Sequence, residues 1–424
     1  MIFIYNILFP LAFIFFIPGM VIKLFRRPGH KNSYLERFAL YSREKQQQLS
    51  TYKGATWIHS VSVGETVIAL NLIAEWRKSA PERKFIISTT TTTGQDLARK
   101  RVPENVAVIF CPIDFYFFVR KAVKIVKPTL LVILETEIWP NLLKQVKKNG
   151  GHTVLVNGRM SDKSARGYHR FKIFFRPVFS LFDQVCVQTT IDMQRYKAVA
   201  PQLNCQVKGN MKFDQKLPEK MPQIALAEYF GSAAKRIILG ASTHPGEEEL
   251  IAKVFKNLKK QFADLKLIII PRHAERGNEI ARQLEQQSIS FTQRSKNSST
   301  NQIVDCLLAD TTGEMLAFIR QADLVIMGKS LAGHDEGHNI IEPAMLGKAI
   351  VTGGILKNFR FVLNAFTQRN AIVTVDHDNE LENILIRMLK DPTLLKQYGA
   401  TAKQVTEEHC GATTKIIKTL ENYS

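Results

Sequence analysis

The chain has 424 residues, of which 45% are hydrophobic and 23% are charged. This balance excludes a disordered or low-complexity protein, and the length exceeds what a single hydrophobic core usually fills. Lys and Arg outnumber Asp and Glu by 58 to 38, which gives a formal net charge of +20. Such an excess favours a polyanionic partner, either nucleic acid, anionic lipid or a phosphorylated substrate. The five cysteines lack the spacing of a metal site or redox pair, so we expect buried thiols and no metal or cofactor.

The first 22 residues, MIFIYNILFPLAFIFFIPGMVI, are apolar and uncharged, and a basic stretch that begins at Lys23 follows them. A helix of about 22 residues is about 33 Å long, enough to cross the hydrocarbon core of a bilayer. A buried core helix is the alternative, but Pro10 and Pro18 make an uninterrupted soluble helix awkward. The segment predicts an N-terminal membrane-anchor helix over residues 1–22, with the rest of the chain on the cytoplasmic side.

Short apolar runs alternate with helical patterns from residue 56 onward, as is typical of a parallel sheet covered on both faces. A Pro- and Lys-rich break at residues 201–222 separates two sets of predicted strands. The first set is 56–61, 84–88, 106–110, 129–134, 153–156 and 184–188, and the second is 236–239, 265–270, 323–327, 349–351 and 372–375. We therefore expect an α/β protein with two Rossmann-like domains, 23–215 and 216–424, facing each other across a cleft. Chemistry is expected in the loops at the carboxyl ends of the strands, and the last helix could pack back on the first domain.

Carboxylates follow two predicted strands of the first half. Glu65 comes after the first strand, in the turn SVGE that also contains Ser62 and Gly64. Glu135 and Glu137 come after the fourth strand, in ETEIWPN. Either group can be a favourable partner for the N-terminus of the next helix, and either can act as a general base that deprotonates an attacking hydroxyl.

A basic and aromatic stretch covers residues 157–182, NGRMSDKSARGYHRFKIFFRPVFSLF, and contains Arg159 and Arg166. Such a stretch suits an anionic membrane surface or a phosphorylated lipid, and the preceding anchor favours that interpretation. The alternative is a surface helix whose aromatic face is packed against the protein.

The second half places small and polar residues after its strands. The segment GASTHPGEEE at residues 240–249 runs into a helix N-terminus that is suited to a phosphate, and Arg272 and His273 follow the next strand. His244 and His273 can be ligands or bases, although a plain hydrogen-bonding role explains each of them. In residues 327–344 glycines let the backbone approach a ligand, and Glu342 is placed to hold ribose hydroxyls. No Walker A or GxGxxG pattern is present.

Taken together, these segments resemble the Kdo transferases, bacterial enzymes that add 3-deoxy-D-manno-oct-2-ulosonic acid (Kdo) to the lipid A precursor. The resemblance covers nearly the whole chain and rests on the anchor, SVGE, ETEIWPN, NGRMSDKS, GNMKFD at 209–214, PRH at 271–273 and GHNIIEPA at 337–344. It implies a GT-B glycosyltransferase fold that binds the lipid acceptor in the first domain and the donor CMP-Kdo in the second. By this resemblance Glu65 is the general base, and Glu135 and Lys212 stabilise the transition state.

The same resemblance assigns the remaining site residues. The segments that hold CMP correspond here to Pro271, Arg272, Met327, Gly328, Lys329, Asn339, Ile340, Ile341 and Glu342. We place the acceptor against Ser62, Gly64, Arg159 and Arg166. The chain departs from the family pattern where many members have Gly-Gly-Ser and Gly-Gly-His-Asn turns, because here Lys329 and Glu336 replace a glycine in each turn.

The leading hypothesis is therefore an inverting transferase that moves Kdo from CMP-Kdo to the lipid A precursor (lipid IVA) at the cytoplasmic face of the bacterial inner membrane. A sugar-nucleotide epimerase or hydrolase of the same two-domain fold is the alternative enzyme, but it has no evident use for an anchor and a basic aromatic surface. A third hypothesis is a non-enzymatic protein that binds lipid or nucleic acid, but it does not explain the carboxylates at the strand ends. No recognised nucleic-acid module is present, so no nucleic-acid partner is expected.

Overall fold

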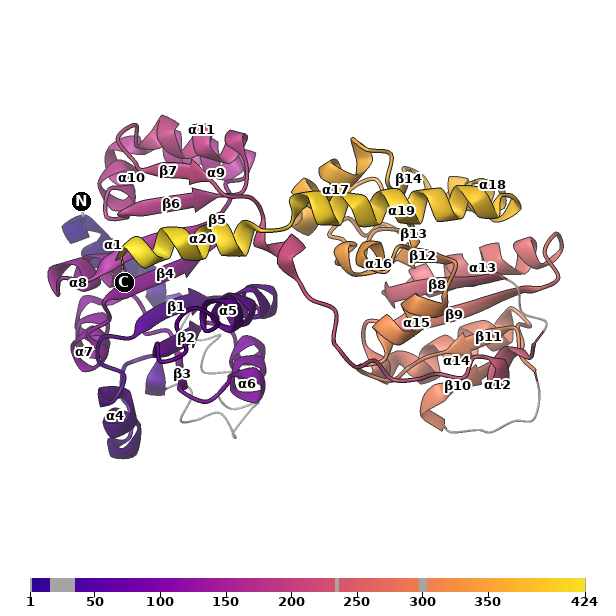
Figure 1. Ribbon diagram of the computed structural model, residues 1–424, viewed down its shortest axis with the longest axis horizontal. Coiled ribbons are helices and arrows are strands. Elements are labelled where there is room, and N and C mark those ends of the chain that lie inside the picture. The colour runs from indigo at the N-terminus through magenta and orange to yellow at the C-terminus, as the bar shows by residue number, and fades with distance from the viewer. Residues whose placement is uncertain (1, 16–34, 233–235, 297–302, 424) are drawn as a thin grey trace. The chain divides into compact units, whose positions relative to one another are not determined.

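The computed structural model describes residues 2–15, 35–232, 236–296 and 303–423. The chain divides into two compact units, which are residues 1–215 together with 410–424, and residues 216–409. Each unit is an α/β layer structure built on its own parallel sheet (Figure 1). The predicted pair of Rossmann-like folds is therefore confirmed.

The N-terminal unit contains a seven-stranded sheet in the order β3-β2-β1-β4-β5-β6-β7. All six neighbouring pairs are parallel, and β1 to β4 are buried along their whole length, because apolar side chains cover both faces. The strands are β1 (Thr56–Ser60), β2 (Phe85–Thr89), β3 (Val106–Phe110), β4 (Leu130–Leu134), β5 (His152–Gly158), β6 (Gln184–Val187) and β7 (Cys205–Val207).

Helices cover both faces of this sheet. One core joins the sheet to α7, α8, α10 and α11, and the other joins it to α5, α6 and α20. The helices of this unit are α1 (Ile2–Ile14), α4 (Arg43–Ser50), α5 (Val63–Trp76), α6 (Thr92–Arg101), α7 (Tyr116–Val126), α8 (Pro140–Lys148), α9 (Asp162–Arg170), α10 (Lys172–Phe179), α11 (Thr190–Val199), η2 (Met211–Asp214), α20 (Ala412–Leu420) and η7 (Glu421–Tyr423).

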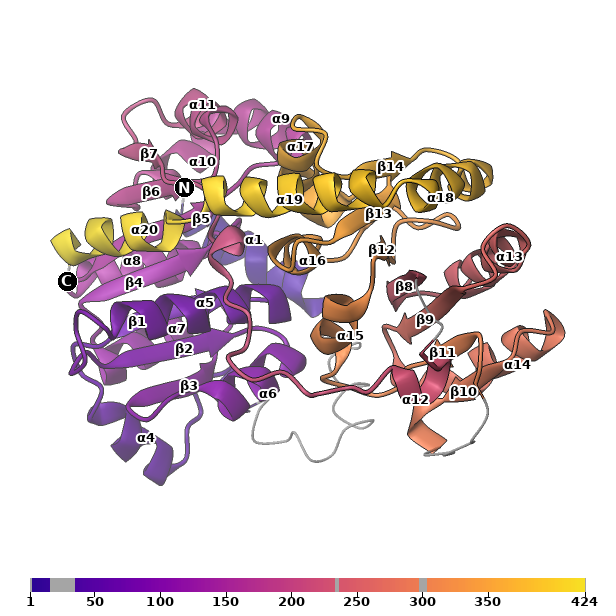
Figure 2. The same cartoon turned by 45° about the vertical axis from the view of Figure 1, so that its right-hand side comes forward.

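The C-terminal unit repeats this architecture with the strand order β10-β11-β9-β8-β12-β13-β14, again parallel throughout (Figure 2). Its strands are β8 (Arg236–Thr243), β9 (Leu265–Pro271), β10 (Phe291–Gln293), β11 (Cys306–Leu308), β12 (Leu324–Met327), β13 (Ala349–Gly353) and β14 (Val373–Val375). Its helices are α12 (Ala227–Phe230), α13 (Glu247–Lys259), η3 (Ala274–Arg276), α14 (Gly277–Gln286), η4 (Arg294–Lys296), α15 (Met315–Gln321), α16 (Ile341–Met345), η5 (Lys357–Phe359), α17 (Arg360–Thr367), η6 (Asp378–Glu380), α18 (Leu381–Lys390) and α19 (Pro392–His409).

All eleven predicted strands are present, with ends that differ by a few residues at most. The structure adds β7, β10 and β11, three short strands that the sequence analysis missed. Each has only three residues, and β7 and β10 contain glutamines that interrupt an apolar pattern. All three lie at or next to a sheet edge, where burial on both faces is not required.

The last helix, α20, belongs to the N-terminal unit although it follows α19 of the C-terminal unit. Its apolar residues Ile416 and Leu420 are buried in the core that includes Trp76 of α5. Asp214 fixes the start of the helix, because its carboxylate accepts the backbone N–H groups of Gly411 and Thr413 at 2.5 Å each.

The predicted N-terminal anchor is only partly described. Helix α1 covers 13 residues, a length of about 20 Å, and residues 16–22 of the predicted anchor lie outside the described residues. Among the helices that the structure describes, none is long and apolar enough to cross a membrane. Helix α1 packs on the N-terminal unit through the rings of Phe9 and Phe13 against Phe115, while Phe3 remains 76% exposed.

Candidate active site

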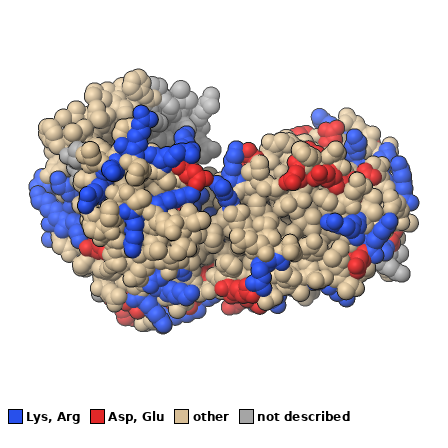
Figure 3. Space-filling view, turned by 90° about the horizontal axis from the view of Figure 1, so that it is seen from above, with Lys and Arg blue, Asp and Glu red and all other residues tan. Residues whose placement is uncertain are grey.

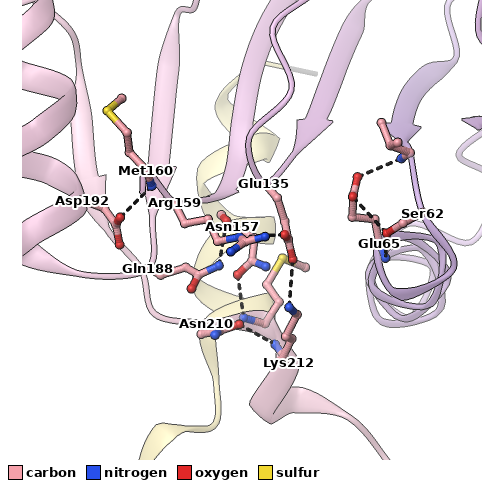
Figure 4. A network of polar contacts seen from close by, with 12 residues as sticks. Ser62, Glu65, Glu135, Asn157, Arg159, Met160, Gln188, Asp192, Asn210 and Lys212 are labelled. Carbon is pink, nitrogen blue, oxygen red and sulfur yellow. Dashed lines mark hydrogen bonds and ion pairs between the residues drawn. The ribbon is translucent and has the colours of Figure 1, made fainter. Parts of the chain in front are cut away.

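Glu65 lies in the first turn of α5, directly after β1. Ser62 is the N-cap residue, and its hydroxyl oxygen accepts the backbone N–H of Glu65 at 3.4 Å. The Glu65 carboxylate points back across the turn and accepts the backbone N–H of Val61 at 2.8 Å and the Ser62 hydroxyl at 3.1 Å (Figure 4). The helix begins at Val63, so the Ser-Val-Gly-Glu turn is itself the start of the helix and supplies its cap.

The electrostatic environment of Glu65 suits a group that exchanges a proton near neutrality. Burial, together with the negative charges of Glu135 and Glu137, raises the pKa of its carboxyl to about 7. The hydrogen bonds from Val61 and Ser62 oppose these effects, because they stabilise the charged form. The side chain is only half-buried, so it remains open to a reactant.

Glu135 lies directly after β4 and is held by two cations. Its side chain is buried, and its oxygens contact Arg159 Nε at 3.0 Å and Lys212 Nζ at 3.3 Å. The backbone of Glu135 has a φ of +59°, a conformation that non-glycine residues seldom adopt, which turns the carboxylate toward these two side chains. Strain of this kind is common at functional sites. The structure thus brings two of the three predicted catalytic residues, Glu135 and Lys212, into direct contact.

Two asparagines hold the segment that carries Lys212. Asn157, at the carboxyl end of β5, accepts the backbone N–H of Met211 at 3.0 Å, and Asn210 accepts the N–H of Lys212 at 3.0 Å (Figure 4). Gln188, directly after β6, donates from its side-chain amide to the backbone carbonyl oxygen of Asn157 at 3.0 Å. The sequence analysis did not single out these residues. The signal available was an Asn before Gly at the end of a buried strand, a pairing typical of backbone with positive φ.

Only some of the predicted acceptor-binding residues lie close to Glu65 and Glu135. Ser62, Gly64 and Arg159 lie near the two carboxylates, since they flank Glu65 or contact Glu135. Arg166 is exposed on α9 and contacts neither carboxylate in the structure. The basic and aromatic stretch forms two short helices, α9 and α10. Phe179 of α10 is buried, whereas Ile173 of α10 and Phe171, which lies between the two helices, are exposed. The N-terminal unit carries many basic and few acidic side chains on the face seen in Figure 3.

In the C-terminal unit, Glu247 organises the loop predicted to hold the donor. Its carboxylate is completely buried and accepts the N–H groups of His244, Lys329, Ser330 and Leu331 at 2.8–2.9 Å. Gly328 is required next to this loop, because a Cβ there would lie 2.3 Å from the Ser242 carbonyl oxygen. Lys329 has a φ of +62° and pairs with Glu336 at 3.1 Å, so the two departures from the family pattern contact each other.

The other predicted CMP-binding residues divide into exposed and buried groups. Arg272 is exposed after β9, and its backbone N–H is tied to the Thr243 carbonyl at 2.9 Å. Asn339 accepts the N–H of Ile341 and starts α16, and burial raises the pKa of the Glu342 carboxyl. The side chains of the remaining residues are buried in the unit, so only their backbone is available to a nucleotide: Pro271, Met327, Ile340 and Ile341.

A cavity of about 700 Å³ adjoins this loop at the carboxyl ends of β12, β13 and β14. It lies within the C-terminal unit, and its wall includes Ser330, His334, Ile355 and Asp376. Its size suits a nucleotide or a sugar. Among the described residues, the structure contains no group of three or more His, Cys, Asp and Glu side chains placed to hold a metal ion.

Comparison with known proteins gives a consistent assignment. A profile of the family described as 3-deoxy-D-manno-octulosonic-acid transferase (kdotransferase) matches residues 32–215. A 3-deoxy-D-manno-octulosonic acid transferase of Rickettsia bellii is 33% identical over 88% of this chain and 88% of its own length. The transferase of the same name from Haemophilus influenzae is 27% identical over 94% of this chain and 93% of its own length.

Solved structures support the fold alone. A putative UDP-N-acetylglucosamine 2-epimerase from Listeria monocytogenes matches 88% of this chain and 96% of its own with a TM-score of 0.59 at 9% identity. MurG of Acinetobacter baumannii matches 87% of this chain and 99% of its own with a TM-score of 0.53 at 14% identity. The GT-B fold is therefore shared with both of these proteins. The identity over most of the chain decides the family: the protein belongs to the 3-deoxy-D-manno-octulosonic acid transferases, which are glycosyltransferases.

Proposed function

We propose that this transferase moves Kdo from CMP-Kdo to a hydroxyl group of the lipid A precursor (lipid IVA), with inversion and with Glu65 as the general base. One observation carries this proposal: the half-buried Glu65 carboxyl at the end of β1 has its pKa raised to about 7. A base whose pKa lies near the working pH is both ionised in a large fraction of molecules and basic enough to accept a proton.

The chemical step follows from that placement. The acceptor hydroxyl gives its proton to Glu65 while its oxygen forms a bond to the anomeric carbon of Kdo. The bond between that carbon and the phosphate oxygen breaks, and CMP leaves with the electron pair. Attack on the face opposite to the leaving group inverts the configuration. Glu65 then releases its proton to solvent, and its hydrogen bonds from Val61 and Ser62 keep the carboxylate aimed throughout.

Glu135 and Lys212 have a supporting role in this proposal. Lys212 supplies positive charge next to Glu135, and Glu135 holds Lys212 and Arg159 in place at 3.3 and 3.0 Å. A pre-positioned cation stabilises negative charge that develops during the reaction without reorganising at that moment. The two ion pairs also offset the energetic cost of burying the negative charge of Glu135.

In the C-terminal unit, the exposed Arg272 and the loop from Gly328 to Lys329 are the proposed contacts for the donor phosphate. Glu342 and Asn339, at the start of α16, are the proposed contacts for the ribose hydroxyls. Glu247 orders this loop through four hydrogen bonds. This order supports a role of the loop in donor binding, because a pre-formed loop loses little entropy when a ligand binds.

The acceptor is an amphipathic lipid, and we propose that the enzyme meets it at the cytoplasmic face of the inner membrane. The exposed apolar residues of α1 and α10, among them Phe3 and Ile173, can enter the lipid interface. The net charge of +20 favours association with anionic lipid.

The test is incubation of the purified protein with CMP-Kdo, generated in place because it hydrolyses, with and without the lipid A precursor. We expect CMP release that depends on the acceptor, together with a product heavier by one or more Kdo residues in a mass spectrum. Release at the same rate without the acceptor would contradict the transferase and favour a hydrolase of the same fold.

A further inference from the structure

Four histidines meet in the C-terminal unit at the carboxyl ends of neighbouring strands. His244 follows β8, His273 follows β9, and His334 and His338 lie in the loop after β12. The ring centre of His244 lies 5.1 Å from that of His338, 5.5 Å from that of His334 and 6.0 Å from that of His273. We call these four residues the histidine cluster. The three loops that supply it are the loops in which the donor contacts were proposed.

The contact at the centre of the cluster requires at least one neutral ring. His244 Nε2 and His338 Nε2 lie 2.9 Å apart, so one nitrogen donates a proton and the other accepts it. His334 is held separately, because its Nε2 donates to the Pro245 carbonyl oxygen at 3.0 Å. Charging both His244 and His338 would break their mutual hydrogen bond and place two cations in contact.

The surroundings of the cluster are strongly cationic. Burial, followed by nearby positive groups that include Arg272 and Lys329, lowers the pKa of His244 to about 4 and that of His338 to about 3. Both rings are therefore neutral at physiological pH when the site is empty.

The carboxylates around the cluster are engaged with other groups. Glu247 is occupied by four backbone N–H groups. Glu336 pairs with Lys329 at 3.1 Å, and Glu275 lies 3.7 Å from His273. In the lining of the neighbouring cavity, Asp335 pairs with Lys357, and Asp378 accepts the N–H of Ala332. These carboxylates therefore do not accept hydrogen bonds from the paired rings. Among the described residues, the rings of His244 and His338 are hydrogen-bonded to each other.

We propose that His244 and His338, with His334 and Lys329 beside them, form an anion-binding site that takes up a proton from solvent when its ligand binds. A bound anion neutralises the cationic surroundings and accepts a hydrogen bond from each ring. The His244–His338 hydrogen bond then breaks, and the ring nitrogen that had been the acceptor gains a proton. A charged imidazole bound to an anionic oxygen makes a stronger hydrogen bond than a neutral one.

The chemistry of the ligand is an anionic oxygen group. This inference rests on the proposed function, because CMP-Kdo offers two such groups, the phosphodiester and the carboxylate of Kdo. His334 also lines the cavity of about 700 Å³, so a ligand in that cavity lies against one member of the cluster. With the carboxylate as its ligand, the site would distinguish a donor that carries a sugar acid from nucleotide sugars that lack a carboxylate.

The pH dependence follows from the direction of the proton transfer. Binding raises the affinity of the cluster for a proton, so a lower pH favours the bound state. The affinity for the anion should therefore increase as the pH falls from about 8.5 to about 6.5. This trend runs opposite to that expected for the chemical step, in which Glu65 must be ionised.

The experiment is calorimetric titration of the full chain with CMP, free Kdo and cytidine, in two buffers of different ionisation enthalpy. The buffer dependence of the binding heat gives the number of protons taken up. We expect uptake with CMP if the phosphate occupies the site, with Kdo if the carboxylate does, and none with cytidine. The double variant H244N/H338N should lose the uptake and bind the active anion about tenfold more weakly at pH 6.5, with a smaller difference at pH 8.5.

Two controls make the outcome decisive. The variant H152N removes an exposed histidine at the start of β5, outside the cluster, and should behave as the wild type. The phosphate of CMP can itself gain or lose a proton when CMP binds. The difference in proton uptake between wild type and variant removes this contribution of the phosphate. The imidazole signals in the NMR spectrum of the wild type give a second measurement that needs no variant, and one of them should shift toward the protonated form when the anion binds.

The outcomes separate the two proposals. Binding of CMP without proton uptake, or uptake that persists in the double variant, would overturn the anion site and leave the proposed function intact. No binding of either CMP or Kdo to the wild type would overturn the donor half of the proposed function together with the anion site.

Discussion

Glu65 and Glu247 occupy equivalent places in the two units. Each lies in the first turn of the helix that follows the first strand of its sheet, α5 after β1 and α13 after β8. Each turns its carboxylate back toward the preceding loop, Glu65 to the N–H of Val61 and Glu247 to the N–H of His244. Their environments differ: Glu247 is fully buried with four backbone donors, whereas Glu65 is half-buried with one backbone donor and one hydroxyl.

This difference separates a carboxylate that holds a loop from the one that we propose to react. A carboxylate with four N–H donors has its lone pairs occupied and cannot approach a substrate. A carboxylate with two donors and exposed surface keeps accepting capacity, and burial without full compensation raises its pKa, here to about 7. The number of hydrogen-bond donors thus distinguishes the two roles at one topological position.

The largest effect is expected from removal of Glu247. The change Glu247→Ala leaves four buried N–H groups without an acceptor and should destabilise the C-terminal unit by about 4 kcal/mol. Thermal unfolding of the full chain measures this loss. The control Glu249→Ala changes an exposed residue of the same helix and should have little effect. Equal stability of the two variants would contradict the structural role given to Glu247.

Removal of Lys212 should impair chemistry more than binding. The change Lys212→Met deletes one of the two cations that contact Glu135, at 3.3 Å, and should lower kcat by about 100-fold. The affinity for CMP should remain within about twofold, because the residues proposed to bind the donor lie in the other unit. The control Lys208→Met removes a charge four residues earlier in the chain, outside the Glu135–Lys212 ion pair, and should retain activity. A higher KM with an unchanged kcat would argue against the proposed role of Lys212.

Removal of the Glu65 charge should stabilise the protein at alkaline pH. The folded-state pKa of about 7 lies above the unfolded value of about 4.3, so this group contributes stability below pH 4.3 that is lost as the pH rises through 7. At pH 8 the free energy of unfolding of the variant Glu65→Gln should therefore exceed that of the wild type by about 1–3 kcal/mol. Thermal unfolding should show this as a higher unfolding temperature. The difference should vanish near pH 4. A destabilised variant at pH 8 would contradict the cost assigned to the ionised carboxylate.

The smallest effect tests the electrostatic neighbours of Glu65. The negative charge of Glu137 raises the pKa of Glu65, so Glu137→Gln should lower it. The acidic limb of the profile of kcat/KM against pH should then move to lower pH by a fraction of a unit. Glu104→Gln, an exposed site in the same unit, serves as the comparison. A shift toward higher pH would be inconsistent with this coupling.

The sequence predicts the parts of this architecture that depend on local pattern. Continuous apolar runs such as those of β3 and β4 require burial on both faces, and the carboxylates that follow β1 and β4, Glu65 and Glu135, could be placed at strand ends. The three-residue strands β7, β10 and β11 could not be predicted, because so short a run has no period of its own.

The contacts between distant segments were beyond the sequence. The pairing of Glu135 with Lys212 depends on how the segment after β7 returns past β5, and Asn157 and Asn210 fix that path. The role of Glu247 and the convergence of His244 with His338 likewise depend on loops that meet only in the folded unit. The resemblance to Kdo transferases assigned Lys212 a role without giving this physical reason.

The central claim is that Glu65 removes the proton from the acceptor hydroxyl. Single-turnover measurement of Kdo transfer by Glu65→Gln, with saturating CMP-Kdo and lipid A precursor, tests it most directly. We predict a rate lower by about 100- to 10,000-fold with an unchanged affinity for CMP, because the amide keeps the shape of the side chain but accepts no proton. A rate within about tenfold of the wild type would contradict the claim.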